Sequence, residues 1–402
     1  MEEYIRKPLR ENIDEMFIGP FGSSLKNEAF VEKKDAYCMV YEQKHAIQKT
    51  MNVETRYVTK EKYEELKRFN IKGGDIIVSC RGTIGETFVI PLNAPIGIMH
   101  PSIMKIRLKE DVYDRQYFNL LLIKYLREHE AEANGSGVKM AISAKELSEV
   151  CFPVPPIDIQ KDIVILFENV DNIISSRKQQ LLKLDELVKS RFIEMFGDPT
   201  FNPFGWKMVN IAEVVGGKVT NGFFAKRDEY MDDGNVKVLG VANIVNRMYS
   251  NVKDLPRTNG TASDIQKFEV RYGDMLFCRS SLVADGIGKA SIVPMDVPPS
   301  TLFECHVIRL PLNLNKCVPE FMQVLSTTDY FRTQIISQSK TATMTTIGQD
   351  GILKTMIILP PIERQKQFLE FVKQIDKSKF EIQTSLEKLE TLKKALMQKY
   401  FG

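Results

Sequence analysis

Residues able to contact a polyanion occur in three pairs of segments, with one member of each pair in either half of the chain. The first pair places an arginine among small hydroxyl residues, the second is a run of small and basic residues, and the third follows a strand-like run. Lysine and arginine bind phosphates, whereas arginine, asparagine, serine and threonine also read base edges. The candidate polyanion contacts are Ser79, Arg81, Thr83, Arg279 and Ser280; Lys139, Lys340, Thr343 and Thr345; and Lys44, His45, Asn243, Asn246 and Arg247.

Each assignment has an alternative that one sequence leaves open. In the first pair of segments, the two arginines would instead form surface ion pairs. The second pair would be solvated loops. The third pair would differ between the halves through unconstrained sequence drift. Aligned on a shared Gly-Asp step, Arg81 falls opposite Ser280, and Arg279 falls opposite Cys80. Because a one-place slip reverses the face of a strand, the two arginines are expected to have different roles.

No catalytic constellation emerges from the other polar residues. Asn202-Pro203-Phe204 lacks the second proline of the loop with which amino-methyltransferases grip a flipped base, so a turn is the better interpretation. Residues 17–22 imitate a glycine-rich cofactor loop without its strand and helix, and no P-loop sequence occurs. Glu65-Leu66-Lys67 is a nuclease-like tripeptide that is common by chance, and the four histidines lie too far apart to bind a metal. We expect no metal, no cofactor and no catalysis in this chain.

Composition places the chain among ordinary globular proteins. Its 402 residues allow two or three domains, and 43% are hydrophobic while 27% are charged. The net charge of +3 predicts a local basic patch rather than a uniformly basic protein. Charged or polar residues interrupt every apolar run, and the N-terminus lacks the apolar core of a signal peptide. Six scattered cysteines indicate reduced thiols and a cytoplasmic protein without a membrane partner.

The chain is internally duplicated. Residues 135–197 align with 340–402 at a constant shift of 205, and 13 of the 47 positions between 151 and 197 are identical. Pro155-Pro156-Ile157 and Gln160-Lys161 recur as Pro360-Pro361-Ile362 and Gln365-Lys366. The period is too long for a solenoid or a propeller, so it indicates a repeated domain-plus-helix unit with pseudo-two-fold symmetry.

Each repeat is expected to begin with a mixed α/β domain, at 1–156 and at 198–361, because short β-branched runs alternate there with Gly, Pro and Asn. One helical stretch interrupts each domain, around 114–130 and 319–336. A long helix then occupies 157–197 and 362–402, since neither Gly nor Pro occurs from Asp158 to Phe196 or from Glu363 to Phe401. Each rod would measure roughly 58 Å.

The apolar residues of both rods follow a heptad-like rhythm, which indicates a coiled coil. One such helix cannot bury its seam alone, so its duplicate is the expected partner. A parallel pair would bring both globular domains to the same end, so an antiparallel pair and a dumbbell are expected. The seam residues are Ile163, Phe167, Val170, Leu181, Leu184, Phe368, Val372, Ile375, Ile382, Leu386 and Leu389.

This order of segments resembles the specificity subunit of type I restriction–modification systems. The resemblance rests on the paired Pro-Pro-Ile…Gln-Lys openings at 155–161 and 360–366, on the helices that follow, and on the junction at 191–199. Residues 74–85 and 19–25 resemble motifs of the target-recognition domains of that family. The resemblance covers essentially the whole chain.

The resemblance implies a non-catalytic, prokaryotic DNA-recognition subunit. Each target-recognition domain would read one half of a bipartite, asymmetric sequence in double-stranded DNA. The helices would dock two methyltransferase subunits, which bind S-adenosylmethionine, and two motor–nuclease restriction subunits would complete the complex. Two alternatives remain at this point: the recognition half of a single-chain methyltransferase or restriction enzyme, and a coiled-coil adaptor that binds only proteins.

Overall fold

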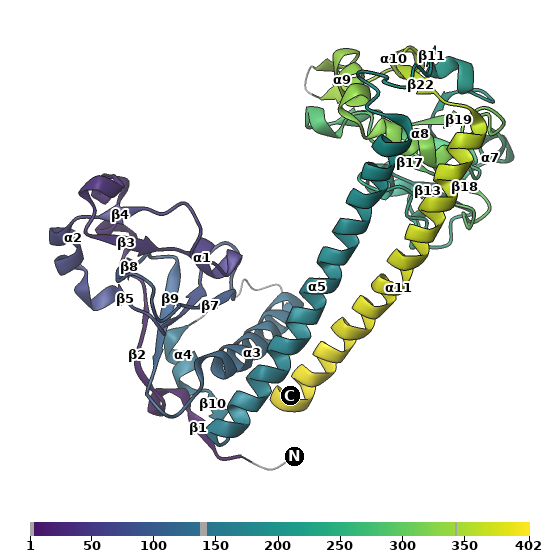
Figure 1. The fold of residues 1–402 in the computed structure, drawn as a ribbon. Coiled ribbons are helices and arrows are strands. Elements are labelled where there is room, and N and C mark those ends of the chain that lie inside the picture. Colours follow the sequence, from purple (N-terminus) through teal and green to yellow (C-terminus); the bar gives the residue numbers. More distant parts are fainter. Residues whose placement is uncertain (1–3, 137–142, 342–343) are drawn as a thin grey trace. The chain divides into compact units, whose positions relative to one another are not determined.

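The computed structural model describes residues 4–136, 143–341 and 344–402, which form two compact units (Figure 1). Unit 1 consists of residues 1–176 with 386–402, and unit 2 consists of residues 177–385. The boundary cuts both long helices, so each helix contributes to both units. Within the described ranges, no helix combines the length and the apolar character needed to cross a membrane.

Unit 1 contains an antiparallel sheet in the order β2-β9-β6-β7 and a mixed sheet in the order β4-β3-β8-β5, in which β3 and β8 run parallel. Strand β6 is buried throughout, which explains the apolar run Ile76-Ile77-Val78 in it. The strands are β1 (Arg6–Pro8), β2 (Ile13–Ile18), β3 (Cys38–Tyr41), β4 (Tyr57–Val58), β5 (Asn70–Ile71), β6 (Ile76–Ser79), β7 (Thr87–Val89), β8 (Gly97–Met99), β9 (Ile103–Leu108) and β10 (Cys151–Pro153). The helices are α1 (Gln43–Gln48), α2 (Lys60–Glu65), α3 (Arg115–Ser136), α4 (Ala144–Glu149) and the first part of α5 (Ile157–Phe196).

Unit 2 has the same topology. Its order β12-β19-β15-β17 matches β2-β9-β6-β7, and its parallel pair β13–β18 matches β3–β8. Unit 2 also contains the three-stranded sheet β16-β21-β20, and the part of unit 1 that aligns with β20 and β21 lies mostly outside the described residues. The strands are β11 (Lys207–Asn210), β12 (Thr220–Asn221), β13 (Val236–Leu239), β14 (Arg257–Thr258), β15 (Asp274–Cys278), β16 (Ser280–Ser281), β17 (Ala290–Ile292), β18 (Thr301–Phe303), β19 (Val307–Pro311), β20 (Lys340–Thr341), β21 (Thr345–Thr346) and β22 (Met356–Leu359). The helices are α6 (Val241–Ile244), α7 (Ala262–Phe268), α8 (Pro319–Ser326), α9 (Asp329–Ser337), α10 (Gln349–Leu353) and α11 (Ile362–Phe401).

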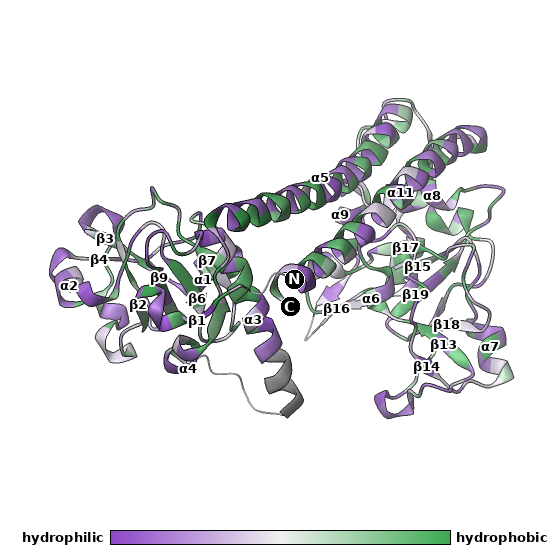
Figure 2. Cartoon of the chain, turned by 90° about the horizontal axis from the view of Figure 1, so that it is seen from below, coloured by the Kyte–Doolittle hydropathy of each residue, from purple (hydrophilic) through white to green (hydrophobic). Residues whose placement is uncertain are grey.

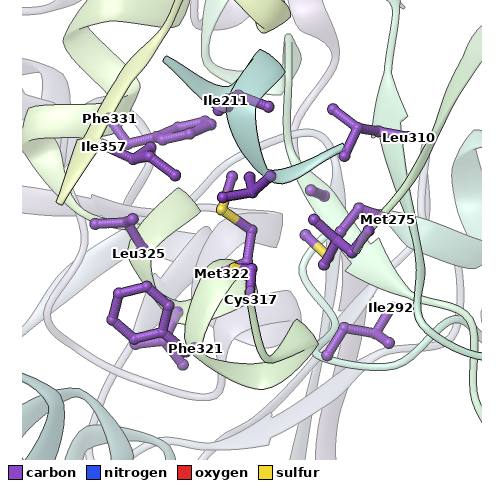
Figure 3. Packing of buried hydrophobic residues seen from close by; sticks show 14 of the residues in the cluster. Ile211, Met275, Ile292, Leu310, Cys317, Phe321, Met322, Leu325, Phe331 and Ile357 are labelled. Carbon is purple, nitrogen blue, oxygen red and sulfur yellow. The ribbon is translucent and has the colours of Figure 1, made fainter. Parts of the chain in front are cut away.

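The expected mixed α/β domains are present, but the expectation of one helical stretch in each was wrong, because α1, α2 and α4 accompany α3 in unit 1 and α6, α7 and α10 occur in unit 2. The single helix expected at 319–336 is two helices, because Thr328 adopts an extended conformation and its hydroxyl accepts a hydrogen bond from the Phe331 amide. That geometry makes Thr328 the N-cap of α9. Helix α8, just before it, is buried throughout and packs in the main core of unit 2, which Figure 3 shows around Met275, Leu310 and Met322.

The two long helices each contain 40 residues, or roughly 60 Å of helix. Helix α5 ends where expected: the Gly197 amide donates to the Ile193 carbonyl at 2.8 Å, and Gly197 has a φ of +76°, the left-handed conformation that favours glycine at this position. Hydrophobic and hydrophilic residues alternate along both helices (Figure 2).

The helices pack antiparallel in each unit, as expected. In unit 1 the Lys393 ammonium pairs with the Asp171 carboxylate, and in unit 2 Lys379 pairs with Asp185 at 2.6 Å. From Asp171 to Asp185 the chain moves toward the end of α5, whereas their partners, Lys393 and Lys379, lie successively nearer the start of α11. The two helices therefore run in opposite directions.

The seam residues fall into three environments. Ile163 and Phe167 belong to the core of the unit 1 domain, and Phe368, Val372 and Ile375 belong to that of unit 2. Val170 and Leu386 are buried between the helices, together with Ile174. The remaining four are only half-buried: Leu181, Leu184, Ile382 and Leu389.

The repeated glutamine joins each long helix to its own domain. The Gln160 side-chain oxygen accepts from the Asp114 amide at 2.8 Å, and its nitrogen donates to the Pro155 carbonyl at 2.8 Å. Gln365 makes the same two contacts, with the Val318 amide at 2.9 Å and the Pro360 carbonyl at 2.8 Å. Both glutamines are fully buried.

Candidate nucleic-acid interface

In the antiparallel sheet of unit 1, strands β2 and β6 end beside the start of strand β9. The Gly19 amide, just after β2, donates to the Ile103 carbonyl at 2.9 Å, and the Cys80 amide, just after β6, donates to the Ser102 carbonyl at 2.8 Å. The segments that leave this end of the sheet are 19–25 and 80–86, and we call it the sheet tip of unit 1. Arg81 and Thr83 lie there, and both are exposed.

The sheet tip of unit 2 is built in the same way. The Gly222 amide donates to the Val307 carbonyl at 3.2 Å, and the Arg279 amide donates to the His306 carbonyl at 2.8 Å. Here the sheet β16-β21-β20 extends the tip, because Ser280 pairs with Thr346 and Ser281 pairs with Thr345. The first and second groups of candidate residues, which are about sixty residues apart in the sequence, are thus brought together in unit 2.

The two arginines differ, as the slipped alignment predicts. Arg279 directly follows the central strand, is half-buried, and donates through Nη1 to the Cys305 carbonyl at 3.2 Å. Arg81 lies one place further along and is exposed. Both guanidiniums remain positioned to offer N–H groups to a phosphate or a guanine.

The arginines supply positive charge at the sheet tips, whereas His100, Cys80 and Cys278 supply none. Burial lowers the pKa of His100, whose ring nitrogen lies 2.8 Å from the Ser102 hydroxyl, so the imidazole is neutral at physiological pH. Burial likewise raises the pKa of Cys80 to about 11 and raises that of Cys278, so both remain neutral thiols.

Three candidate residues are wrong as direct contacts, because they are buried and bonded within the protein. The Ser79 hydroxyl donates to the Thr83 carbonyl at 2.6 Å and accepts from the Glu86 amide. His45 is fully buried, with its Nδ1 bonded to the backbone of Glu42 at the start of α1. The Thr345 hydroxyl is buried 3.1 Å from that of Thr341.

Others have structural contacts of their own. Asn243 caps α6, since its oxygen accepts from the Gly240 amide at 3.0 Å and its nitrogen donates to the Asn251 carbonyl. Lys44 pairs with Glu42 at 3.0 Å. Both side chains therefore stabilise the local fold of the third pair of segments.

Asn246 and Arg247 line a cleft of about 430 Å³ in unit 2, beside Lys189 of α5 and Arg332 of α9. No other described candidate residue lines this cleft. In unit 1 the third group lies beside the sheet tip, since a Cβ atom added to Gly82 would lie 3.7 Å from the side chain of Gln43 in α1. Lys340 is exposed at the edge of the sheet β16-β21-β20, and Lys139 and Thr343 lie outside the described residues.

Sequence reasoning missed one pair of residues at the sheet tips. Phe21 is 87% exposed and Phe224 is 68% exposed. Each lies two residues after a glycine that ends an equivalent strand, at Gly19 and Gly222. The signal was the spacing Gly-x-Phe in both halves, which the strong divergence of the surrounding residues concealed.

Among the residues that the structure describes, no three His, Cys, Asp or Glu side chains gather as a metal would require. The sheet tips instead offer exposed cations, hydroxyls and aromatic rings on loops held by a rigid sheet. That arrangement is suited to recognition of a nucleic acid.

The chain matches the family model described as "Type I restriction modification DNA specificity domain" twice, over residues 18–186 and 203–394. Among curated proteins, it is 24% identical over 349 residues to the type I restriction enzyme MjaVIII specificity subunit of Methanocaldococcus jannaschii, covering 82% of this chain and 79% of that protein. It is 20% identical over 363 residues to the EcoBI specificity subunit of Escherichia coli, covering 81% and 73%.

Solved structures share the fold. A chain from a study of complex assembly and conformational transition of the type I R-M system matches with a TM-score of 0.60 at 15% identity, covering 100% of this chain and 98% of that one. The S subunit from M. genitalium matches with a TM-score of 0.53 at 12% identity, covering 100% and 96%. With two matched domains that together span most of its length, the chain belongs to the family of type I restriction–modification DNA specificity proteins.

Proposed function

We propose that the chain is the sequence-reading subunit of a type I restriction–modification complex, and that each unit reads one half of a bipartite target in double-stranded DNA. The supporting observation is that the two units share topology and glutamine contacts while their sheet tips differ. Arg81 and Arg279 leave the sheet one place apart, and Arg81 is exposed whereas Arg279 is half-buried and donates to the Cys305 carbonyl. Readers of two different half-sites need a common scaffold and different loops.

The catalytic work belongs to partner subunits in this proposal. The chain would bind two methyltransferase subunits and two restriction subunits, and S-adenosylmethionine would bind to the methyltransferase and not to this chain. Support comes from the sheet tips, which carry recognition groups, and from the raised pKa values of Cys80 and Cys278, which keep both thiols from acting as nucleophiles. The purified chain alone is expected neither to methylate nor to cleave DNA.

Methylome sequencing of a host with and without this gene tests the proposal. A bipartite methylated sequence should be present with the gene and absent without it. An unchanged set of methylated sequences would contradict the assignment and would favour a protein-binding adaptor.

Exchange of one domain tests the division of labour between the units. Replacing residues 1–150 with the equivalent domain of a relative should change one half of the methylated sequence and leave the other half unchanged. A simultaneous change in both halves would show that the units do not read separately.

A further inference from the structure

Phe21 and Phe224 occupy the same place in the two units. Strand β2 ends opposite Met104 of β9, and strand β12 ends opposite Ile308 of β19. Met104 and Ile308 are equivalent, because each also pairs with the residue three places after the aspartate of the Gly-Asp step that both units contain. Each phenylalanine lies three residues beyond the end of its strand. The match comes from strand register and not from sequence alignment.

The turns that carry the two rings lie close to the backbone of a neighbouring segment of the same unit. A Cβ atom added to Gly19 would lie 2.2 Å from the carbonyl oxygen of His100, and one added to Gly222 would lie 2.1 Å from that of Glu304. A side chain at either position would force the backbone apart. The two glycines therefore bring each turn against its sheet, so that the phenylalanine two residues later projects from a fixed base.

Neither ring is used by the fold. At 87% and 68% exposure, Phe21 and Phe224 leave most of their apolar area in water. The adjacent Phe223 behaves differently, since its ring is half-buried and packs against Phe268 at a centroid distance of 6.0 Å. Two exposed aromatic rings at equivalent points of diverged domains indicate a shared contact with something outside the chain.

The surroundings favour a polyanion as that contact. Arg81 and Arg279 emerge at the same two sheet tips, and the exposed Lys26 and Lys226 follow the two rings along the chain. Proteins that insert a side chain between base pairs combine an exposed apolar side chain with cations that bind the phosphates.

We propose that Phe21 and Phe224 insert into the bound duplex, one at each half-site, and unstack a base step there. The inference rests on the proposed function and adds a division of roles within each sheet tip. The diverged residues read bases, which differ between half-sites, whereas the common ring performs the step that both half-sites share. A base must leave the stack before a methyltransferase can act on it, so an opened step at each half-site serves the partner's reaction.

The test scans 2-aminopurine, whose fluorescence rises when it unstacks, through both halves of the recognised duplex. The protein is the full chain assembled with its methyltransferase subunits. Wild type should give a fluorescence increase within each half-site. Phe21→Ala should remove at least about four-fifths of the increase in one half-site only, Phe224→Ala should do so in the other, and Phe→Leu at either position should retain most of it.

The chain supplies matched controls at the opposite end of the same sheets. Leu92 and Met295 are equivalent turn residues, and each is 74% exposed. Each lies two residues after one whose backbone amide donates to the carbonyl of the aspartate in the Gly-Asp step. Leu92→Ala and Met295→Ala should leave both fluorescence increases and the binding affinity unchanged. Loss of an aromatic contact with bases should weaken binding roughly tenfold for each phenylalanine.

The outcomes separate the inference from the function on which it rests. Sequence-selective binding by wild type without unstacking, or unstacking that persists in the double Phe→Ala variant, would overturn the wedge and leave the proposed function intact. A double variant whose complex dissociates in the absence of DNA would assign the rings to partner docking and would also overturn the wedge. Absence of selective binding by wild type would remove both.

Discussion

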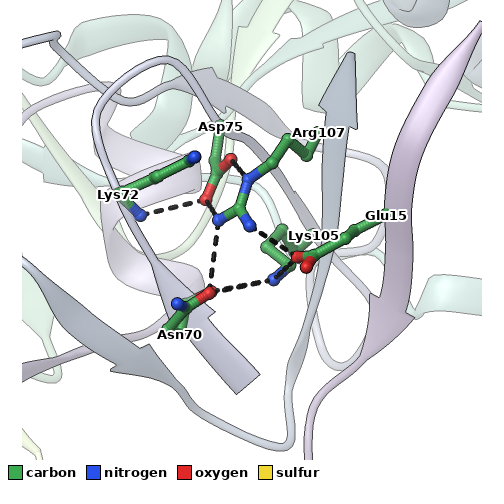
Figure 4. Close-up of polar contacts among 6 residues, drawn as sticks. All are labelled: Glu15, Asn70, Lys72, Asp75, Lys105 and Arg107. Atoms are coloured by element: carbon green, nitrogen blue, oxygen red, sulfur yellow. Dashed lines mark hydrogen bonds and ion pairs between the residues drawn. The ribbon is translucent and has the colours of Figure 1, made fainter. Parts of the chain in front are cut away.

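Asp75 and Asp274 occupy equivalent positions but have different neighbours. The Asp75 carboxylate accepts two hydrogen bonds from Arg107, both at 2.7 Å, and one from the Lys72 amide at 2.9 Å, within the network in Figure 4. In unit 2 the residue that pairs with Asp274 is Pro311, so no guanidinium reaches its carboxylate from that position. Burial raises the pKa of Asp274, despite a 2.9 Å hydrogen bond from the Arg271 amide.

The same substitution should therefore have opposite effects in the two units. Asp75→Asn should destabilise unit 1 by about 2 kcal/mol, because the largely buried guanidinium of Arg107 loses one of its two carboxylate partners and keeps only Glu15. Asp274→Asn should stabilise unit 2 at neutral pH. A carboxyl whose folded pKa is raised destabilises the fold above its unfolded pKa of about 3.9, and the penalty grows until the folded pKa is passed.

Urea unfolding with hydrogen exchange at β6 and β15 measures both effects. The difference between Asp274→Asn and wild type should be smallest well below the unfolded pKa of about 3.9, where the wild-type carboxyl is neutral in both states, and should grow as the pH rises above that value. A destabilised Asp274→Asn at pH 7 would show that its charge is compensated in the fold.

At the residue scale the sequence located the ends of strands better than it predicted which side chains are accessible. Arg81 and Arg279 lie at the sheet tips as expected, because a Gly-Asp step and a β-branched run locate the end of a strand. His45 and Ser79 could not be separated from them, since a polar residue beside a loop reads the same whether it caps the backbone or faces solvent. Phe21 required the strand register, which only the folded sheets provide.

At the scale of elements, the repeated Pro-Pro-Ile…Gln motif is a joint between domain and helix. Gln160 is fully buried, and its side chain bonds the Asp114 amide, the Val112 carbonyl and the Pro155 carbonyl. Gln160→Ala should destabilise unit 1 by at least about 2 kcal/mol, because buried backbone groups would lose their partners. Urea unfolding provides the measurement, and Gln179→Ala on the exposed part of α5 is the control. Equal midpoints for the two variants would rule out this role.

Phe368, one of the seam residues, leads to a second prediction at the scale of elements. Phe368 is fully buried in the unit 2 core, where its ring meets those of Phe192 and Phe196 at centroid distances of 5.7 and 5.6 Å. Phe368→Ala should cost about 3–5 kcal/mol of stability. Phe380, on the same helix but 72% exposed, is the matched control, and Phe380→Ala should change stability by less than about 0.5 kcal/mol.

Calorimetric unfolding of the two variants distinguishes a domain core from a seam between helices. Comparable losses for both would mean that the exposed face of α11 is covered in solution. The heptad rhythm predicted that the helices pair, and the order of the segments predicted that they pair antiparallel. Neither could assign Phe167 and Phe368 to globular cores, since apolar spacing does not identify the partner. The break between α8 and α9 was hidden for a similar reason: two adjacent threonines read equally well inside a helix and as its cap.

At the scale of the whole molecule, the two units share two continuous helices whose register repeats. Asp171 and Asp185 on α5 pair with Lys393 and Lys379 on α11, and the interval is 14 residues on both helices. An insertion in α5 alone would shift one ion pair out of register with the other. Equal insertions in both helices would preserve both pairs.

The final prediction uses this matched interval. Four residues inserted near Ser175–Lys178 and another four after Thr384 add roughly 6 Å to each helix. With base pairs about 3.4 Å apart, the methylated half-sites should move apart by one or two base pairs while their sequences stay the same. Four residues approximate one helical turn, so the apolar stripe continues with limited loss of packing.

Two comparison variants make this experiment decisive. Insertion of two residues in each helix rotates the stripe by about 200° and should prevent assembly. Insertion of four residues in α5 alone should weaken assembly, because one half of the antiparallel pair loses its register. Methylome sequencing of each variant gives the spacing directly. A matched four-residue variant that methylates the original spacing would show that the helices do not set the distance between half-sites, and an altered half-site sequence would show that they influence base reading.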